Sequence, residues 1–233
     1  MGLFKYTINW LLTFCAIVIS ATSHAGIDLY SGSLAMYYTD RWETLAAKWA
    51  KKNGCEYKII RPTNQNKEKA ASDEDILDAA RIWKDTLVKS FKEKELDIKN
   101  WNESLDSEYN TIQVSTKFYD YIDDYEETTK KNLSHLKFEF WIPSEQGIIF
   151  EFTNLQGKYA KMGTTGGIIY EINELSEYYF NENIETLSKK IKSEAVNKTT
   201  ESNTHLELKL QLSEIYDLSI WSLKNGFPMI LSY

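Results

Sequence analysis

The sequence predicts an α+β protein in which an N-terminal helical hairpin packs on a mostly antiparallel β-sheet with one further helix. Two observations lead to this prediction. From about residue 39 to 131, apolar residues recur at every third or fourth position, which is the spacing of amphipathic helices. From about 135 to 233, apolar and polar residues mostly alternate, as in strands with one buried face. Helices followed by strands favour a segregated α+β architecture.

The first 25 residues have the layout of a secretory signal peptide. Lys5 gives a short positive start, residues 10–21 are largely apolar, and small side chains flank His24 directly before Gly26. The apolar stretch is shorter than the ~20 residues that span a bilayer. We therefore expect residues 1–25 to be cleaved, and residues 26–233 to form one exported domain, periplasmic or extracellular, without a transmembrane segment.

The charge of the expected mature chain points to the class of its partner. Cleavage removes Lys5 and no acidic residue, so 26 basic residues face 34 acidic ones, a net charge of −8. This disfavours nucleic acid and anionic lipid, and it is compatible with a basic protein partner. Cys55 is the one cysteine left, so no internal disulfide is expected, and we interpret it as a buried apolar residue rather than a nucleophile.

Helix start and stop signals order the first half of the chain. Asp40 can cap a helix that ends at Gly54, and a strand is predicted from 55 to 61. Ser72, followed by three acidic residues, is typical of a helix entry, and the apolar face that follows predicts a helix to about Lys94.

A second long helix is predicted from about 102 to 130, lying against its predecessor as a hairpin. The weak point of this helix is the segment Thr111–Thr116, whose β-branched residues would also suit a strand.

The second half of the chain opens with a predicted β-hairpin. Residues 136–142 and 148–153 alternate with period two around the turn-forming segment Pro143–Gly147. The remaining predicted elements are strands at 158–162 and 168–172, a helix from Glu174 to about Ala195, strands at 205–212 and 218–223, a turn at Asn225–Gly226 and a closing strand at 227–233.

The glycine-rich segment Gly163–Gly167 is a weak candidate for a phosphate cradle. It lacks the Lys-Ser/Thr ending of a P-loop, and no helix is predicted to follow it. We interpret it as a flexible hairpin loop.

No catalytic or metal-binding motif is found between residues 26 and 233. The two histidines there, His135 and His205, each open a predicted strand, and neither a Gly-x-Ser-x-Gly, a His-Glu-x-x-His nor a Cys/His cluster is present. We interpret both histidines as surface residues at strand ends. No cofactor and no metal ion are expected.

Two glutamates are a candidate catalytic pair. If the turn at 143–147 closes symmetrically, Glu139 and Glu151 face each other across the hairpin, and Glu171 on a nearby predicted strand would join them. Opposed carboxylates repel, so a cation, a basic partner or a shared proton would have to offset them. The alternative is a solvated sheet face with lysine neighbours.

The densest feature of the sequence is the run from Tyr119 to Glu127. On a helix its acidic residues form one ridge, which Tyr121 and Tyr125 flank: Asp120, Asp123, Asp124 and Glu127. Aromatic side chains beside fixed charges are typical of protein interfaces, and an acidic ridge would steer a basic partner. The alternative is the solvated face of an ordinary helix.

Three classes of function remain after these exclusions. The first is an exported, non-enzymatic binding protein, in its most concrete form a periplasmic inhibitor or immunity protein that neutralises a toxin or a cell-wall enzyme. The second is an exported hydrolase that cleaves glycosidic bonds with Glu139 and Glu151. The third is a structural component of an envelope or secretion assembly.

Overall fold

The computed structural model describes residues 27–39, 41–42, 51–52, 54, 73–92, 101, 104, 107–153, 159–195 and 203–232. The predicted signal peptide, Cys55, the predicted strand at 55–61 and most of the helix predicted to start at Asp40 lie outside these residues. At the predicted end of that helix, Gly54 has a φ of 67°, the left-handed conformation in which glycine commonly ends a helix. Among the described residues, none of the helices is both long and apolar enough to cross a membrane.

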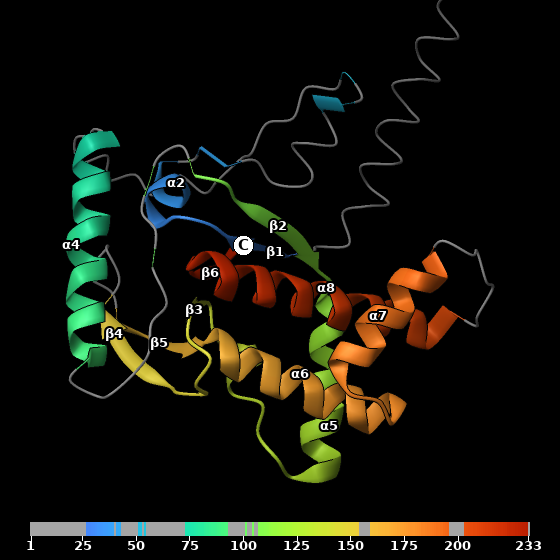
Figure 1. The fold of residues 1–233 in the computed structure, drawn as a ribbon. Helices are drawn as coiled ribbons and strands as arrows, with labels where there is room; N and C mark the ends of the chain where they lie inside the picture. Colours follow the sequence, from blue (N-terminus) through green and yellow to red (C-terminus); the bar gives the residue numbers. More distant parts are fainter. Residues whose placement is uncertain are drawn as a thin grey trace, which may run out of the picture.

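The fold is mixed α/β, built on a six-stranded sheet in the order β2-β1-β6-β3-β5-β4 (Figure 1). The strands are β1 (Ile27–Ser31), β2 (Asn110–Val114), β3 (Phe140–Ile142), β4 (Phe150–Thr153), β5 (Tyr159–Thr164) and β6 (Met229–Ser232). β3 and β5 pair in parallel, whereas the other neighbouring strands pair antiparallel. The sheet is therefore mixed, with antiparallel pairs in the majority.

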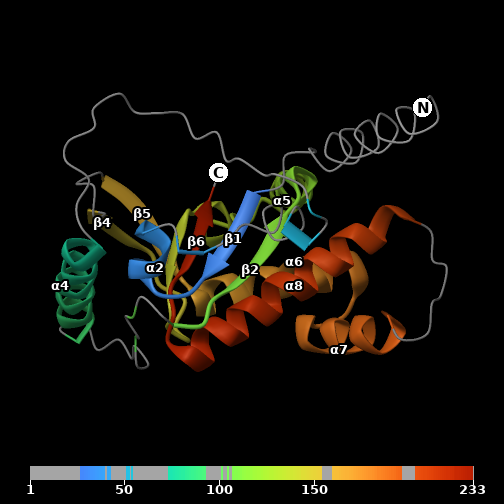
Figure 2. The same cartoon turned by 90° about the horizontal axis from the view of Figure 1, so that it is seen from above.

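Helices cover both faces of the sheet (Figures 1 and 2). They are α2 (Leu34–Tyr38), α4 (Asp73–Lys92), α5 (Thr116–Thr129), α6 (Thr165–Phe180), α7 (Ile184–Ala195) and α8 (Asn203–Asn225), with a 3-10 turn at His135–Lys137. Successive residues of β1 show the two faces: Leu29 packs with α5 to α8, and Tyr30 packs with α2 and α4. Each face of the sheet thus has its own apolar core.

The helix predicted from 102 to 130 is wrong in its first part, because Asn110–Val114 forms β2. The β-branched Thr111, Ile112 and Val114 suit the pleated surface beside β1 better than a helix. Only the second part is helical, as α5. Because α4 and α5 contribute buried side chains to different cores, the described residues do not show the pairing predicted between these helices.

The hairpin predicted across Pro143–Gly147 is also wrong. β3 and β4 are not neighbours, because β5 lies between them in the sheet. The predicted strand at 158–162 is confirmed as β5, and the closing strand is confirmed as β6, which follows a turn at Gly226.

Three further predicted strands are helical in the structure. The predicted strand at 168–172 belongs to α6, and those at 205–212 and 218–223 belong to α8. The helix predicted from Glu174 to Ala195 is two helices, since Asn181 takes a left-handed φ of 54° and ends α6. α8 packs against β2, α6 and α7, so apolar residues occur on several sides of it and obscure the helical period.

Candidate interaction surface

Helix α5 turns one face to the core and the opposite face to solvent. Ser115 caps its first turn, with its hydroxyl accepting from the backbone N–H of Lys117. Phe118, Ile122 and Tyr125 recur at helical spacing and are buried in the core shared with α6 and α8. This register directs the other side of the helix away from the protein.

The four acids of the predicted ridge are exposed on that outer side, so the structure brings them together. They are Asp120, Asp123, Asp124 and Glu127. Asp123 lies 3.5 Å from the ammonium of Lys137, and Asp124 accepts a hydrogen bond of 2.7 Å from the Tyr179 hydroxyl. Within the described part of the chain, Asp120 and Glu127 have no ion-pair or hydrogen-bond partner for their carboxylates. The ridge therefore presents negative charge to solvent.

The two tyrosines predicted to flank the ridge differ from each other. Tyr121 is half-buried at the edge of the ridge, and its ring meets Tyr179 edge to face with centroids 5.6 Å apart. Tyr125 does not flank the ridge, because its ring is buried and its hydroxyl donates to Glu174 at 2.8 Å. Tyr125 therefore anchors α5 to α6, and the prediction that it is a contact residue is corrected.

Helix α6 supplies aromatic side chains that sequence reasoning did not select. Tyr178 is 42% exposed, and its ring lies edge to face with both Tyr125 and Tyr179, at 5.1 and 4.8 Å. The Tyr179 hydroxyl lies 2.7 Å from Asp124 and 3.0 Å from the carbonyl of Tyr121. The sequence signal for them is the aromatic run at 178–180, within the helix predicted from Glu174.

Burial and the neighbouring Asp124 carboxylate hold the pKa of Tyr179 well above its usual range. The hydroxyl therefore stays protonated and remains a donor to Asp124 at neutral pH. This hydrogen bond holds both side chains in place.

Two lysines fix the acids on the inner edges of α5 and α6. Lys131 pairs with Glu174 at 2.5 Å, and Lys137 pairs with Glu126 at 2.6 Å. The hydrogen bonds from Lys131 and then from Tyr125 lower the pKa of Glu174. Burial alone would raise the pKa of Glu126, but the bonds from Lys137 and the backbone N–H of Leu133 outweigh it and lower the pKa. Lys131 and Lys137 therefore neutralise Glu174 and Glu126, which are not ridge residues, and most of the ridge keeps its negative charge.

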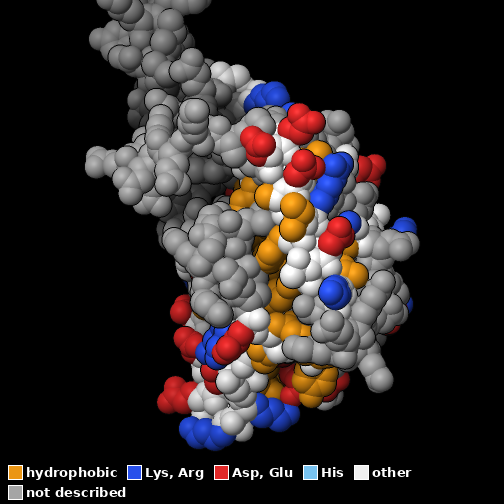
Figure 3. Space-filling view, turned by 90° about the vertical axis from the view of Figure 1, so that its left-hand side faces the viewer, with side chains coloured by type: hydrophobic (Ala, Val, Ile, Leu, Met, Phe, Trp, Pro, Cys, Tyr) orange, Lys and Arg blue, Asp and Glu red, His pale blue; other side chains and the backbone are white. Residues whose placement is uncertain are grey.

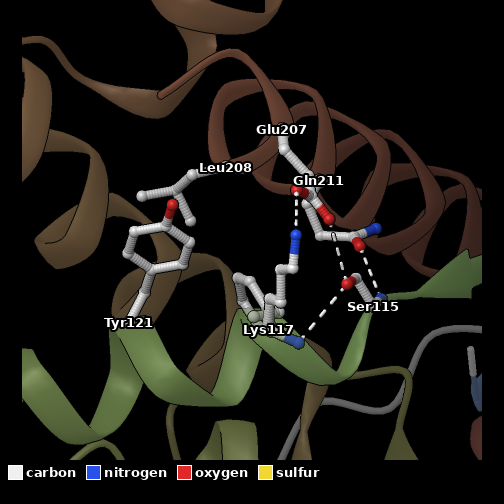
Figure 4. A pocket seen from close by; sticks show the side chains of 7 residues that line it. Ser115, Lys117, Tyr121, Glu207, Leu208 and Gln211 are labelled. Carbon is white, nitrogen blue, oxygen red and sulfur yellow. Dashed lines mark hydrogen bonds and ion pairs between the residues drawn. The ribbon is translucent and has the colours of Figure 1, made fainter. Parts of the chain in front are cut away.

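A shallow hollow lies between α5 and α8, beside Tyr121 (Figure 4). Its polar groups are satisfied by one another: Ser115 donates to Glu207 from its hydroxyl at 3.1 Å and to Gln211 from its backbone N–H at 2.7 Å. Lys117 lies 3.5 Å from Glu207. With these donors and acceptors already engaged, the hollow has the character of a helix-packing seam rather than a ligand site.

The other exposed side of the molecule carries α4. Hydrophobic side chains form a band there between acidic and basic ones (Figure 3), and Ile82 on α4 is 68% exposed. Charges of both signs are mixed along this helix, as in the pair of Arg81 with Asp78 at 3.4 Å. Along the described part of α4, charges of both signs therefore lie side by side, in contrast to α5.

The candidate catalytic pair is not assembled. Glu151 on β4 stands opposite Lys161 on β5, and Glu139 lies before β3, on the other side of β5. The two glutamates therefore do not oppose each other, and the geometric basis of the hydrolase hypothesis is lost. The third glutamate, Glu171, lies on α6 rather than on a strand.

The histidines also lie elsewhere than predicted. His135 is not a surface residue: it is 7% exposed, and its Nδ1 lies 2.9 Å from the buried carboxylate of Glu171. His205 is exposed as predicted but belongs to α8 rather than to a strand end.

The segment Gly163–Gly167 joins the end of β5 to the first turn of α6, which begins at Thr165, so the predicted hairpin loop and the expectation that no helix follows are wrong. The N-terminus of α6 is nevertheless occupied, because Thr164 caps it and the backbone N–H of Gly166 donates to the carbonyl of Ser144 at 2.8 Å. A Cβ on Gly166 would lie 2.0 Å from the carbonyl oxygen of Glu145. These glycines permit close packing of the chain on itself, which leaves no space for a phosphate at this point.

Within the described ranges, no group of three or more His, Cys, Asp or Glu residues could hold a metal ion. Comparison of the chain with protein-family models, with curated proteins and with solved structures finds no match. The function is therefore inferred from the residues of this chain alone.

Proposed function

We propose that the protein is an exported, non-enzymatic binding protein that captures a basic protein on the α5–α6 surface, defined by Asp120, Tyr121, Asp123, Asp124, Glu127, Tyr178 and Tyr179. Its role is that of a periplasmic inhibitor or immunity protein, which neutralises a toxin or a cell-wall enzyme by covering it. The observation that carries the proposal is the row of exposed carboxylates beside Tyr179, whose hydroxyl is held by hydrogen bonds and whose ring packs against Tyr121 and Tyr178.

The acids on α5 are difficult to explain by stability. Asp123, Asp124 and Glu127 lie in the second half of the helix, and no basic residue lies in its last turn. Negative charges near a helix C-terminus oppose the helix dipole, and like charges three or four positions apart repel each other. Asp120 stands in that relation to Asp123 and Asp124, and Glu127 stands in the same relation to both. The fold carries these charges at a local cost, which supports a role in binding.

The tyrosines supply the contact area for affinity that exposed acids do not provide. A charged ridge accelerates encounter with a partner of opposite sign, but exposed ion pairs add little affinity. Tyrosine adds contact area with few side-chain torsions to immobilise, and it is enriched in the residues that dominate binding energy. Tyr179 contacts Asp124, and its ring packs against those of Tyr121 and Tyr178, so a basic partner drawn to the carboxylates would meet aromatic surface.

The test is an affinity capture with three forms of the purified protein. The first is the wild type, and the second carries Asp120→Lys, Asp123→Lys and Asp124→Lys. The control carries the same change of net charge on the opposite side of the molecule, at the exposed Glu74, Asp78 and Asp85 of α4. We expect a basic protein to be retained by the wild type and by the control, and to be lost from the α5 variant.

The inhibitor role needs a second measurement. The captured protein should have a lytic or toxic activity that falls to a residual level when the wild-type protein is added in equal amount. A captured protein retained equally by all three forms would remove the α5–α6 surface from the proposal. Capture without any inhibition would instead indicate a structural assembly.

A further inference from the structure

The pair formed by His135 and Glu171 is buried, and the proposed binding function makes no use of it. Glu171 is 5% exposed and accepts three hydrogen bonds, from the backbone N–H groups of His135 and Leu136 at 3.0 and 2.9 Å and from His135 Nδ1 at 2.9 Å. Three donors therefore surround one buried carboxylate, and the imidazole ring supplies one of them.

The other ring nitrogen of His135 also faces an acceptor. Nε2 lies 3.3 Å from the carbonyl oxygen of Ile148. A neutral imidazole carries one N–H, so one of its two nitrogens would direct a lone pair at an oxygen. An imidazolium carries two N–H groups and satisfies both contacts. The arrangement of acceptors therefore fits the protonated ring.

The ring has little room to move away from these two acceptors. A Cβ on Gly163 would lie 2.7 Å from the ring, and a Cβ on Gly167 would lie 2.0 Å from it, so the backbones of β5 and α6 pass directly beside the imidazole. The carbonyl of His135 also accepts a hydrogen bond from the Trp141 indole at 2.7 Å. If the imidazole loses or gains a proton, the contact that must change is the one between Nε2 and Ile148.

Ile148 belongs to the segment Pro143–Ile149, which crosses the N-terminus of α6 and is here called the strap. The strap is held at Ser144, which accepts from the N–H of Gly166 at 2.8 Å, and at Ile148, whose N–H donates to the Thr164 hydroxyl at 3.2 Å. The hydroxyl of Thr164 also donates to the carbonyl of Gln146. Among these contacts of the strap, the one to His135 involves an imidazole, the type of side chain that titrates between about pH 5 and 8.

We propose that the His135–Glu171 pair is a pH-sensitive fastening that holds the strap to the N-terminus of α6 when the imidazole is protonated and loosens it when the ring becomes neutral. The Nδ1 proton is retained by the Glu171 carboxylate, so the proton lost is the one on Nε2. The carbonyl of Ile148 then faces a lone pair. The contact with Ile148 is therefore made by the imidazolium and lost in the neutral ring.

The charged groups near the ring are few and mostly engaged elsewhere. Glu171 is the charged residue that touches it from α6, and Glu174, almost one turn further along, is bound by Lys131. Lys137 on the same 3-10 turn pairs with Glu126 and Asp123, and Lys161 on β5 stands opposite Glu151. Glu145 on the strap is exposed. None of these other groups contacts the imidazole.

The test is nuclear magnetic resonance of the 15N-labelled protein at about pH 5 and about pH 8, the range in which histidine titrates. Long-range proton–nitrogen spectra should show both nitrogens of His135 protonated at the acidic pH and Nε2 unprotonated at the alkaline one. Amide exchange at Ile148 and Gly166, corrected for the intrinsic effect of pH, should become faster by about 5-fold, the equivalent of one net hydrogen bond. His205→Asn is the control, and its response should match that of the wild type.

Other results would overturn the proposal. One is an Nε2 that already lacks its proton at about pH 5. Another is a ring that titrates while the corrected exchange of the strap amides stays the same. A pH response that disappears in the His205 variant would assign the effect to the other histidine. Because the readout is taken on the protein without any partner, failure of the proposed binding function would not affect it.

Discussion

The side chain of Gln211 on α8 accepts a hydrogen bond of 2.7 Å from the backbone N–H of Ser115. Its Nε2 donates to the carbonyl of Gln113 at 2.9 Å. Gln113 lies in β2 and Ser115 directly follows it, and β2 is an edge strand of the described sheet. An edge presents unpaired backbone groups on which another chain can add a strand. Gln211, which is 6% exposed, occupies these groups and closes that part of the edge.

We therefore predict that Gln211→Leu lowers the free energy of unfolding by about 1–3 kcal/mol, because two part-buried backbone groups lose their partner. The variant should also associate in a concentration-dependent way through β2. Urea unfolding and sedimentation velocity measure the two effects. Leu210→Ala, which changes an exposed side chain of the same helix, should change stability by no more than about 0.5 kcal/mol. A Gln211 variant as stable as the control would mean that water replaces the amide.

A second prediction concerns the close approach of α6 to the 3-10 turn. In Gly167→Ala the added Cβ would lie 2.0 Å from the His135 ring, and displacing that ring should cost about 1–3 kcal/mol or more. The matched control is Gly147→Ala, whose Cβ meets only the Cα of Gly167, at an ordinary 3.7 Å. Urea unfolding should separate the two variants clearly. Equal stability would show that the ring can move aside without loss.

A third prediction concerns alkaline pH. Burial, with the neighbouring Tyr37 as the smaller cause, raises the pKa of Tyr38 to about 12. The pKa of Tyr179 is raised by burial and Asp124. A raised pKa means that the folded state keeps a proton that the unfolded chain loses, so stability is full below the ordinary tyrosine pKa of about 10 and falls as the pH rises above it. Melting temperatures measured across this range should fall less steeply for Tyr179→Phe than for the wild type.

Some elements of this fold follow from local sequence alone. The sequence offers a capping residue before α4, acids in its first turn and an apolar face, and this helix was predicted within two residues at each end. The four acids of α5 fall on one side of the helix wherever the helix begins. The acidic ridge was therefore predicted correctly, although the first part of the predicted helix is a strand. Patterns of this kind depend on residues within one or two turns of each other, which is the range over which helical spacing acts.

The errors arise where distant contacts decide the structure. Gly166 and Gly167 disfavour a helix start, but the close approach of Glu145 and His135 requires them there. Leu206 to Leu212 alternate as in a strand because α8 is packed on several sides. The pairs His135–Glu171 and Tyr125–Glu174 join residues 36 and 49 positions apart. No local period reports such contacts, so the buried pair and the tyrosines of α6 could not be placed from sequence.

The last prediction separates stability from binding on α5. Removing charge from the unpaired acids, with Asp120→Asn and Glu127→Gln together, should leave the protein as stable as the wild type or more stable by about 0.5–1 kcal/mol. The change relieves repulsion within the helix and, at Glu127, an unfavourable interaction with the helix dipole. The affinity for the captured basic protein should fall, chiefly through a slower association rate that depends on salt.

Glu126→Gln is the matched control for that experiment, because it makes the same chemical change on the same helix. Glu126 is held by Lys137 and by the backbone N–H of Leu133 at 2.7 Å, so its neutralisation should lower stability while the association rate changes little. Calorimetry and surface plasmon resonance measure the two quantities. If the double variant lost stability, the exposed acids would have a structural role that their surroundings do not show. If it bound the partner as fast as the wild type, the partner would not be recognising the ridge by its charge.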